Sequence, residues 1–225
     1  FYGYNEYPNS KDNDGHWGIF DEPMMQFAVQ TLSESVQPFA ATIFTLSSHS
    51  PYRLPPQHQG KFATGELEIH PSIGYVDYAL KQFFAAAENE PWFKKTIFVI
   101  TGDHTQKTVD KHYQSLVGMY RVPLLFYVPG QNLGGDPLRL TQHLDILPTL
   151  MDMLAFPPEP RLKIGQNVFG QGSGLAFNGD ERGYWLLNNK LLLEYLWADR
   201  QFNWKSFDPH TWKMGEVLYV TPDDA

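Results

Sequence analysis

The sequence has 225 residues, of which 42% are hydrophobic, 15% aromatic and 19% charged. A chain of this length and apolar content can bury a sizeable core, which argues against disorder and fits one α/β domain or one large piece of it. The net charge of -8 leaves no basic surface suited to a run of phosphates, so we expect no nucleic-acid partner.

The first part of the chain alternates between two kinds of apolar pattern. Helical spacing or short continuous apolar runs predict, in order, a helix at 21–35, a strand at 39–46, a helix at 72–88, strands at 96–101 and 122–128, and a helix at 145–154. This alternation predicts an α/β fold with a mostly parallel sheet flanked by helices.

The pattern changes after Gly183. Two short apolar runs, 184–187 and 191–196, are separated by Asn188, Asn189 and Lys190, which is typical of a hairpin. We therefore expect residues 1–160 to form the α/β part of one domain spanning 1–225, and residues 161–225 to form a small antiparallel appendage. The start at Phe1, rather than at Met, indicates a fragment whose upstream sequence is missing.

A carboxylate and an imidazole follow the strongest predicted strand. Asp103 and His104 come directly after the run at 96–101, and ligands of open α/β sheets bind outside the carboxyl ends of the strands. A divalent ion accepts both ligand types. In the alternative interpretation, Asp103 caps a turn and His104 is an exposed loop residue.

Two further histidines belong to the same predicted region. His49 follows the run at 39–46, and His112 lies eight residues after His104. An imidazole that titrates near neutrality can hold a phosphate oxygen or protonate a leaving group. The alternative for His49 is a loop histidine stacked on Tyr52.

Several segments in a fixed order resemble the lipoteichoic acid synthase-like sulfatase family of the alkaline phosphatase superfamily. They are HWGIFDEPM (16–24), FTLSSHSPY (44–52), TIFVITGDHT (96–105), YRVPLLFYVPG (120–130) and QHLDILPTL (142–150). The resemblance covers essentially the whole chain. It implies an alkaline phosphatase-like fold and identifies the chain as the carboxyl-terminal part of such a catalytic domain.

The resemblance also implies roles for individual residues. Asp103 and His104 match the metal ligands, for one divalent ion that is usually Mn²⁺, with Mg²⁺ or Zn²⁺ in relatives. His49 matches the catalytic histidine that contacts the substrate phosphate, and His112 stands where relatives carry a histidine shortly after the Asp-His pair, which implies a second substrate contact. His143 is a ligand in two-metal relatives, and we expect it to be structural here.

One part of the family's active site has no match in this sequence. The nucleophilic Thr and a metal-binding Glu lie far upstream of the Asp-His pair in the family, so this chain is expected to carry half a site. The implied activity is transfer of a phosphoglycerol or phosphoethanolamine group from a phospholipid to a glycan or lipid acceptor, at the extracytoplasmic face of the cell membrane through an anchor absent here. The alternatives are a phosphodiesterase or sulfatase that uses water, and a non-catalytic module that has lost the nucleophile half.

Overall fold

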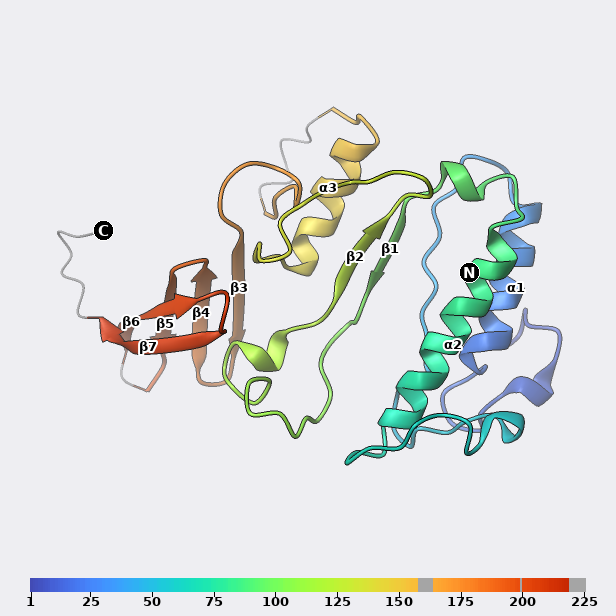
Figure 1. The fold of residues 1–225 in the computed structure, drawn as a ribbon, viewed down its shortest axis with the longest axis horizontal. Helices are drawn as coiled ribbons and strands as arrows, with labels where there is room; N and C mark the ends of the chain where they lie inside the picture. Colours follow the sequence, from blue (N-terminus) through green and yellow to red (C-terminus); the bar gives the residue numbers. More distant parts are fainter. Residues whose placement is uncertain (158–163, 199, 219–225) are drawn as a thin grey trace. The chain divides into compact units, whose positions relative to one another are not determined.

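The computed structural model describes residues 1–157, 164–198 and 200–218 (Figure 1). The chain divides into two compact units, residues 1–132 and residues 133–225. Within the described residues no helix is both long and apolar enough to cross a bilayer.

The first unit, all of which is described, contains two long helices and two short strands. These are α1 (Asp21–Glu34), α2 (His70–Ala87), β1 (Phe98–Thr101) and β2 (Leu124–Tyr127), with the 3₁₀ turns η1 (Ser10–Asp12), η2 (Pro56–His58), η3 (Phe93–Lys95) and η4 (Gly118–Tyr120). The helices expected at 21–35 and 72–88 are confirmed, with small shifts at their ends.

The core of this unit lies between α1 and α2. Acidic residues and a proline in the first turn favour the start of α1, because they match the positive end of the helix dipole and need no N–H partner. The buried cluster consists of Met25, Val29, Ala79, Phe83, Ala87, Trp92 and Phe93. The members that belong to α1 and α2 recur at helical spacing, which is why the apolar periodicity identified these helices correctly.

The strand expected at 39–46 is not formed. This run is extended but unpaired, and among the described residues the strand pairings of this unit join β1 to β2 alone, apart from one isolated bridge. Phe39 and Ile43 still pack against the α1–α2 core. The apolar run thus correctly indicated that Phe39 and Ile43 pack against the core. A strand also requires a hydrogen-bonding partner, and the composition of one run does not specify that partner.

β1 and β2 correspond to the runs expected at 96–101 and 122–128. They pair antiparallel, with Phe98 opposite Tyr127 and Thr101 opposite Leu124. The mostly parallel sheet is not seen among the described residues, where both sheets are antiparallel. One face of the pair packs on Phe84 of α2, while Leu125 is 53% exposed, so these strands are not buried on both faces.

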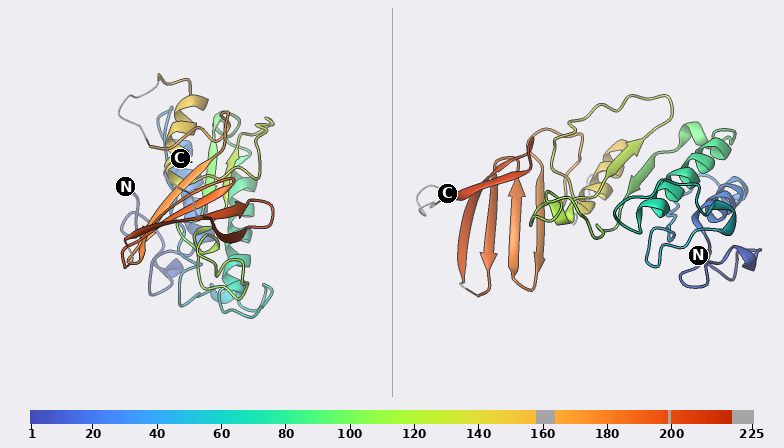
Figure 2. Two further views of the ribbon diagram at one scale, coloured as in Figure 1. Left: turned by 90° about the vertical axis from the view of Figure 1, so that its left-hand side faces the viewer. Right: turned by 60° about the horizontal axis from the view of Figure 1, so that its bottom comes forward.

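The second unit contains a short helix and an antiparallel sheet. In its described residues these are η5 (His143–Asp145), α3 (Ile146–Met153), β3 (Leu175–Asp180), β4 (Gly183–Asn188), β5 (Leu191–Leu196), β6 (Gln201–Asp208) and β7 (Lys213–Leu218). The strands follow one another in sequence order across the sheet, as Figure 2 shows. The predicted hairpin is β4–β5, and it belongs to a larger meander than we expected.

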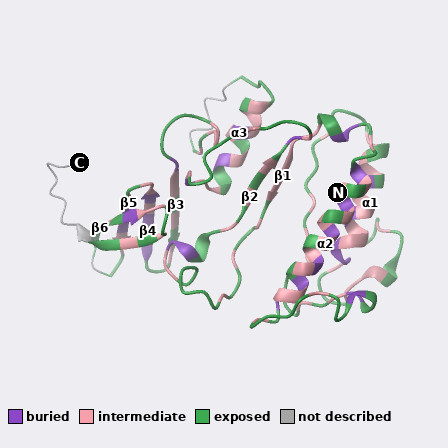
Figure 3. Ribbon diagram, in the orientation of Figure 1, coloured by how far each residue is buried: buried purple, intermediate pink, exposed green. Residues whose placement is uncertain are grey.

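The two faces of this sheet differ in burial. Side chains alternate along each strand, and Trp185, Leu187 and Leu192 on one face are buried (Figure 3). The opposite face carries exposed aromatic rings, among them Phe177 at 54% and Phe202 at 64% exposure. The antiparallel order with one solvated face explains the alternating pattern of the sequence.

Candidate functional site

The turn that carries the predicted metal ligands follows directly after β1. The Thr101 hydroxyl at the end of β1 donates a 2.9 Å hydrogen bond to the carbonyl oxygen of Pro123, the residue before β2. Beyond the turn, the Thr105 hydroxyl donates to the carbonyl oxygen of Met119. Both ends of the turn are therefore fastened to the segment that leads into β2.

The side chains of Asp103 and His104 converge within this turn. Nε2 of His104 lies 3.6 Å from Oδ2 of Asp103. Nδ1 of His104 lies 2.7 Å from the carbonyl oxygen of Thr105, and because a carbonyl oxygen only accepts, Nδ1 carries a proton. Neutral His104 consequently has its lone pair on Nε2, the nitrogen that faces the carboxylate.

This arrangement fits two ligands of one divalent ion. Ligand atoms that each lie about 2.0–2.2 Å from an ion are at most about 4.4 Å apart, so the 3.6 Å separation allows both atoms to bind the same ion. The Thr105 carbonyl orients the imidazole in the way that a metal-bound histidine is usually oriented. The His104 and Asp103 side chains are 59% and 60% exposed, which leaves room for further ligands.

The described residues do not complete a metal centre. No group of three or more His, Cys, Asp or Glu side chains suited to holding an ion occurs among them. Protein zinc sites, for comparison, use three or four protein ligands. Asp103 and His104 therefore stay candidate ligands, and in the described part of the chain no third His, Cys, Asp or Glu side chain joins them.

His49 lies in an exposed turn, and its ring packs against a tryptophan rather than against the ring of Tyr52. Nδ1 of His49 is 2.9 Å from the carbonyl oxygen of Ser50, and the indole Nε1 of Trp17 donates a 2.7 Å hydrogen bond to the same oxygen. The rings of His49 and Trp17 lie 4.0 Å apart at 52°. The carbonyl again places the imidazole proton on Nδ1, so Nε2 is the atom open to a substrate.

The start of the His49 turn is held by a buried carboxylate. Asp21, 1% exposed, accepts hydrogen bonds through Oδ1 from the backbone N–H groups of Leu46 at 2.8 Å and Ser47 at 3.0 Å. Burial raises the pKa of Asp21, although these N–H groups oppose the rise. Sequence reasoning missed Asp21 and Trp17 as neighbours of His49, although both stand in the HWGIFDEPM segment.

His112 and His143 are both exposed and lie in different units. The backbone N–H of His112 donates to Asp110, and no contact joins the His112 or His49 ring to the Asp103–His104 pair in the described structure. His143 begins η5, whose Asp145 is buried and caps the turn through Gln142. Asp145 therefore has a structural role in the second unit, and the substrate role of His112 stays a prediction.

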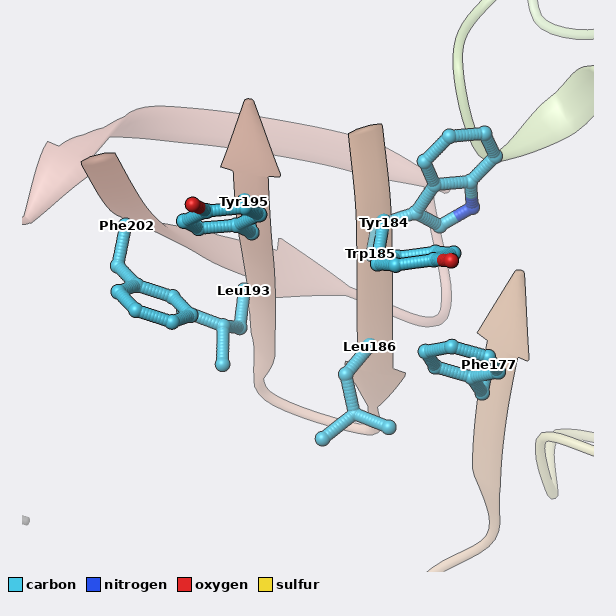
Figure 4. A pocket seen from close by; sticks show the side chains of 7 residues that line it. All are labelled: Phe177, Tyr184, Trp185, Leu186, Leu193, Tyr195 and Phe202. Carbon is cyan, nitrogen blue, oxygen red and sulfur yellow. The ribbon is translucent and has the colours of Figure 1, made fainter. Parts of the chain in front are cut away.

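The second unit also contains a shallow hollow of about 380 Å³ on the exposed face of its sheet (Figure 4). Its walls are apolar and aromatic, and include Phe177, Tyr184, Leu193 and Tyr195. No carboxylate or imidazole lines it, so it lacks the convergent polar groups that a catalytic pocket requires. The Asp103–His104 turn remains the candidate for the chemistry.

Comparison with known proteins identifies the class. The sequence pattern of the family described as Sulfatase matches residues 1–155, and the chain belongs to this family. Among solved structures, a protein in the alkaline phosphatase superfamily from Vibrio parahaemolyticus matches with a TM-score of 0.81 over 98% of this chain and 54% of the other, at 23% identity. The alkaline phosphatase-like fold expected from the sequence is thereby confirmed.

The curated relatives that the chain matches include lipoteichoic acid synthases. Lipoteichoic acid synthase 1 of Bacillus subtilis is 26% identical over 80% of this chain, and lipoteichoic acid synthase of Staphylococcus aureus is 22% identical over 85%. The match covers 31% and 33% of these two proteins. The chain thus spans about a third of the length of the curated relatives that it matches.

Proposed function

We propose that this protein contributes the metal-binding and phosphate-binding half of a phosphotransferase site. The reaction is transfer of a phosphoglycerol or phosphoethanolamine-type group from a phospholipid to a glycan or lipid acceptor outside the cytoplasm. The observation that carries the proposal is the convergence of Asp103 Oδ2 and His104 Nε2 at 3.6 Å, in a chain whose curated relatives are named lipoteichoic acid synthases.

In this proposal Asp103 and His104 hold one divalent ion. We assign Mn²⁺, with Mg²⁺ or Zn²⁺ as the alternatives. Such an ion, when bound, supplies a Lewis acid that draws charge from phosphoryl oxygens and lowers the pKa of a hydroxyl nucleophile. The two residues supply different donors, since the carboxylate brings negative charge and the imidazole a neutral nitrogen. The nucleophile, a threonine in the family pattern, is expected upstream of Phe1.

His49 is assigned to phosphate binding and proton transfer. Its Nδ1–H already donates to the Ser50 carbonyl, so only the imidazolium form has a second N–H, on Nε2, for a phosphate oxygen or a leaving oxygen. After the leaving oxygen takes that proton, neutral His49 offers the Nε2 lone pair to the hydroxyl of the incoming acceptor. His112 is assigned to a second contact with the substrate phosphate.

A hydrolase is the second candidate, favoured by the family description itself. A phosphodiesterase or sulfatase would use the same residues with water in place of the acceptor alcohol. Product analysis separates the two reactions. A phospho-group recovered on the glycan or lipid acceptor supports transfer, whereas only free alcohol, phosphate ester or sulfate supports hydrolysis.

The test uses the full-length protein with manganese and a labelled phospholipid donor. Asp103→Ala and His104→Ala should abolish product formation, while Asp77→Ala and His210→Ala, which alter exposed residues outside the proposed site, should leave it unchanged. Full activity in both site variants would refute the proposal. A wild-type protein that folds and binds manganese but yields no product would instead favour the non-catalytic module.

A further inference from the structure

We propose that Trp17 is a positioning residue for His49, fixing the tautomer and the direction of the imidazole that contacts the substrate phosphate. The inference rests on the proposed role of His49. It adds a residue that lies 32 positions earlier in the sequence and whose side chain is 51% exposed. An indole exposed to this extent contributes little to a core, so its contacts need another explanation.

Trp17 and His49 share one hydrogen-bond acceptor. The Ser50 carbonyl oxygen receives the Trp17 Nε1–H at 2.7 Å and lies 2.9 Å from His49 Nδ1. A carbonyl oxygen has two lone pairs, so these two donors saturate it. With the oxygen held by the indole, the His49 ring has a fixed acceptor for Nδ1–H, and its Nε2 is turned away from the backbone.

The rings of Trp17 and His49 are also in contact. The Trp17 and His49 rings are 4.0 Å apart, so the indole limits rotation of the imidazole about its side-chain bonds. The indole therefore restricts the orientation of the His49 ring.

Trp17 is itself anchored by Asp14. Asp14 Oδ1 accepts hydrogen bonds from the backbone N–H groups of His16, Trp17 and Gly18 at 2.7, 2.8 and 3.1 Å. Partial burial acts against ionisation, but these donors lower the pKa of Asp14. The Asp14 carbonyl also accepts a 3.0 Å hydrogen bond from the Arg53 guanidinium, beyond the far end of the His49 turn.

The segment 14–21 thus holds the His49 turn and the residue just beyond it at three points. Asp21 holds its beginning through Leu46 and Ser47, the indole holds the Ser50 carbonyl, and the Asp14 carbonyl holds Arg53. Two attachments within the turn and one just beyond it leave little freedom to the histidine between them. This is the rigid support that a catalytic side chain needs for accurate placement.

The experiment compares Trp17→Phe and Trp17→Ala with wild type in the full-length manganese-loaded protein, using a chromogenic nitrophenyl phosphodiester. Loss of one hydrogen bond should lower kcat/KM roughly 3- to 10-fold in Trp17→Phe. Loss of both ring and donor should lower it by up to roughly 100-fold in Trp17→Ala. Trp197→Phe, which changes another half-exposed tryptophan, is the matched control and should match wild type.

Two readouts separate positioning from a general structural effect. The ¹⁵N shifts of the His49 ring should report a proton on Nδ1 in wild type and a tautomer mixture in Trp17→Ala. In a His49→Ala background the Trp17 substitutions should cause no further loss, because residues that act through one another are not additive. Unfolding midpoints close to wild type would show that the variants are folded.

The result that overturns the inference is an active wild-type enzyme whose Trp17 variants keep the same tautomer and the same kcat/KM. An equal loss from Trp17→Ala with and without His49 would overturn it as well. Failure of the proposed function looks different. In that case wild type turns over no phosphodiester, while the tautomer of His49 still depends on Trp17, which supports the positioning role.

Discussion

The buried Asp21 carboxylate makes the folding stability depend on pH in a direction opposite to that of most acids. Asp21→Asn is the perturbation, because the amide keeps the Oδ1 acceptor for Leu46 and Ser47 but cannot ionise. Burial raises the folded pKa of Asp21 above its ordinary value of 3.8. Above pH 3.8 the folded state therefore holds its proton more tightly than the unfolded state does.

The sign and size of the effect follow from proton linkage. Below pH 3.8 both states are protonated, and the carboxyl adds no pH dependence. As the pH rises through the interval between 3.8 and the raised value, wild type loses stability relative to Asp21→Asn. The loss is about 1.4 kcal/mol for each pH unit that separates the two pKa values, and it is complete above the raised value.

Urea unfolding of both proteins at a series of pH values measures this difference directly. Subtracting the two free energies of unfolding cancels the contributions of the other carboxyls. We expect the stability of wild type minus that of Asp21→Asn to fall as the pH rises. A difference that is flat, or that grows with pH, would refute the assignment of Asp21 as a desolvated carboxyl.

Two further predictions concern loop packing and a buried ion pair. Gly118→Ala would place a Cβ 1.9 Å from the carbonyl oxygen of His112, and we expect the free energy of unfolding to fall by about 1–3 kcal/mol. We also expect weaker manganese binding, because the carbonyl of the neighbouring Met119 holds the Thr105 hydroxyl beside the candidate ligands. Unfolding and manganese titrations check this, and wild-type values in both would contradict it. Lys205→Met would leave the buried Glu194 without its 2.6 Å partner and should cost about 3–5 kcal/mol, whereas the double change with Glu194→Leu should recover most of it. A single variant as stable as wild type would contradict the second prediction.

The sequence identified the helices and the strands of the hairpin because their apolar spacing reflects burial directly. It failed at 39–46, where Phe39 and Ile43 are packed as expected but no strand partner exists among the described residues. The sequence also did not predict the relative direction of the paired strands. The runs that became β1 and β2 are equally apolar in either orientation, and pairing direction depends on connections that single runs do not encode.

The candidate site was predicted in part for a similar reason. Asp103 and His104 are adjacent in sequence, so a short turn was enough to bring their side chains together. The ring that packs on His49 belongs to Trp17 and not to Tyr52, the partner in the alternative interpretation, because Trp17 is brought to His49 only by folding of the segment before α1. Local motifs therefore indicate candidate ligands, whereas the residues that support them become visible only in the fold.

Manganese binding to the full-length protein shows whether Asp103 and His104 bind one divalent ion. Equilibrium dialysis and Mn²⁺ electron paramagnetic resonance of wild type should show one tightly bound ion, with a nitrogen coupling that disappears when His104 alone is replaced. Asp103→Ala and His104→Ala should each weaken manganese binding by more than the roughly 10–100-fold typical of losing a residue that only orients a metal ligand. Unchanged stoichiometry, affinity and nitrogen coupling in both variants would contradict the claim.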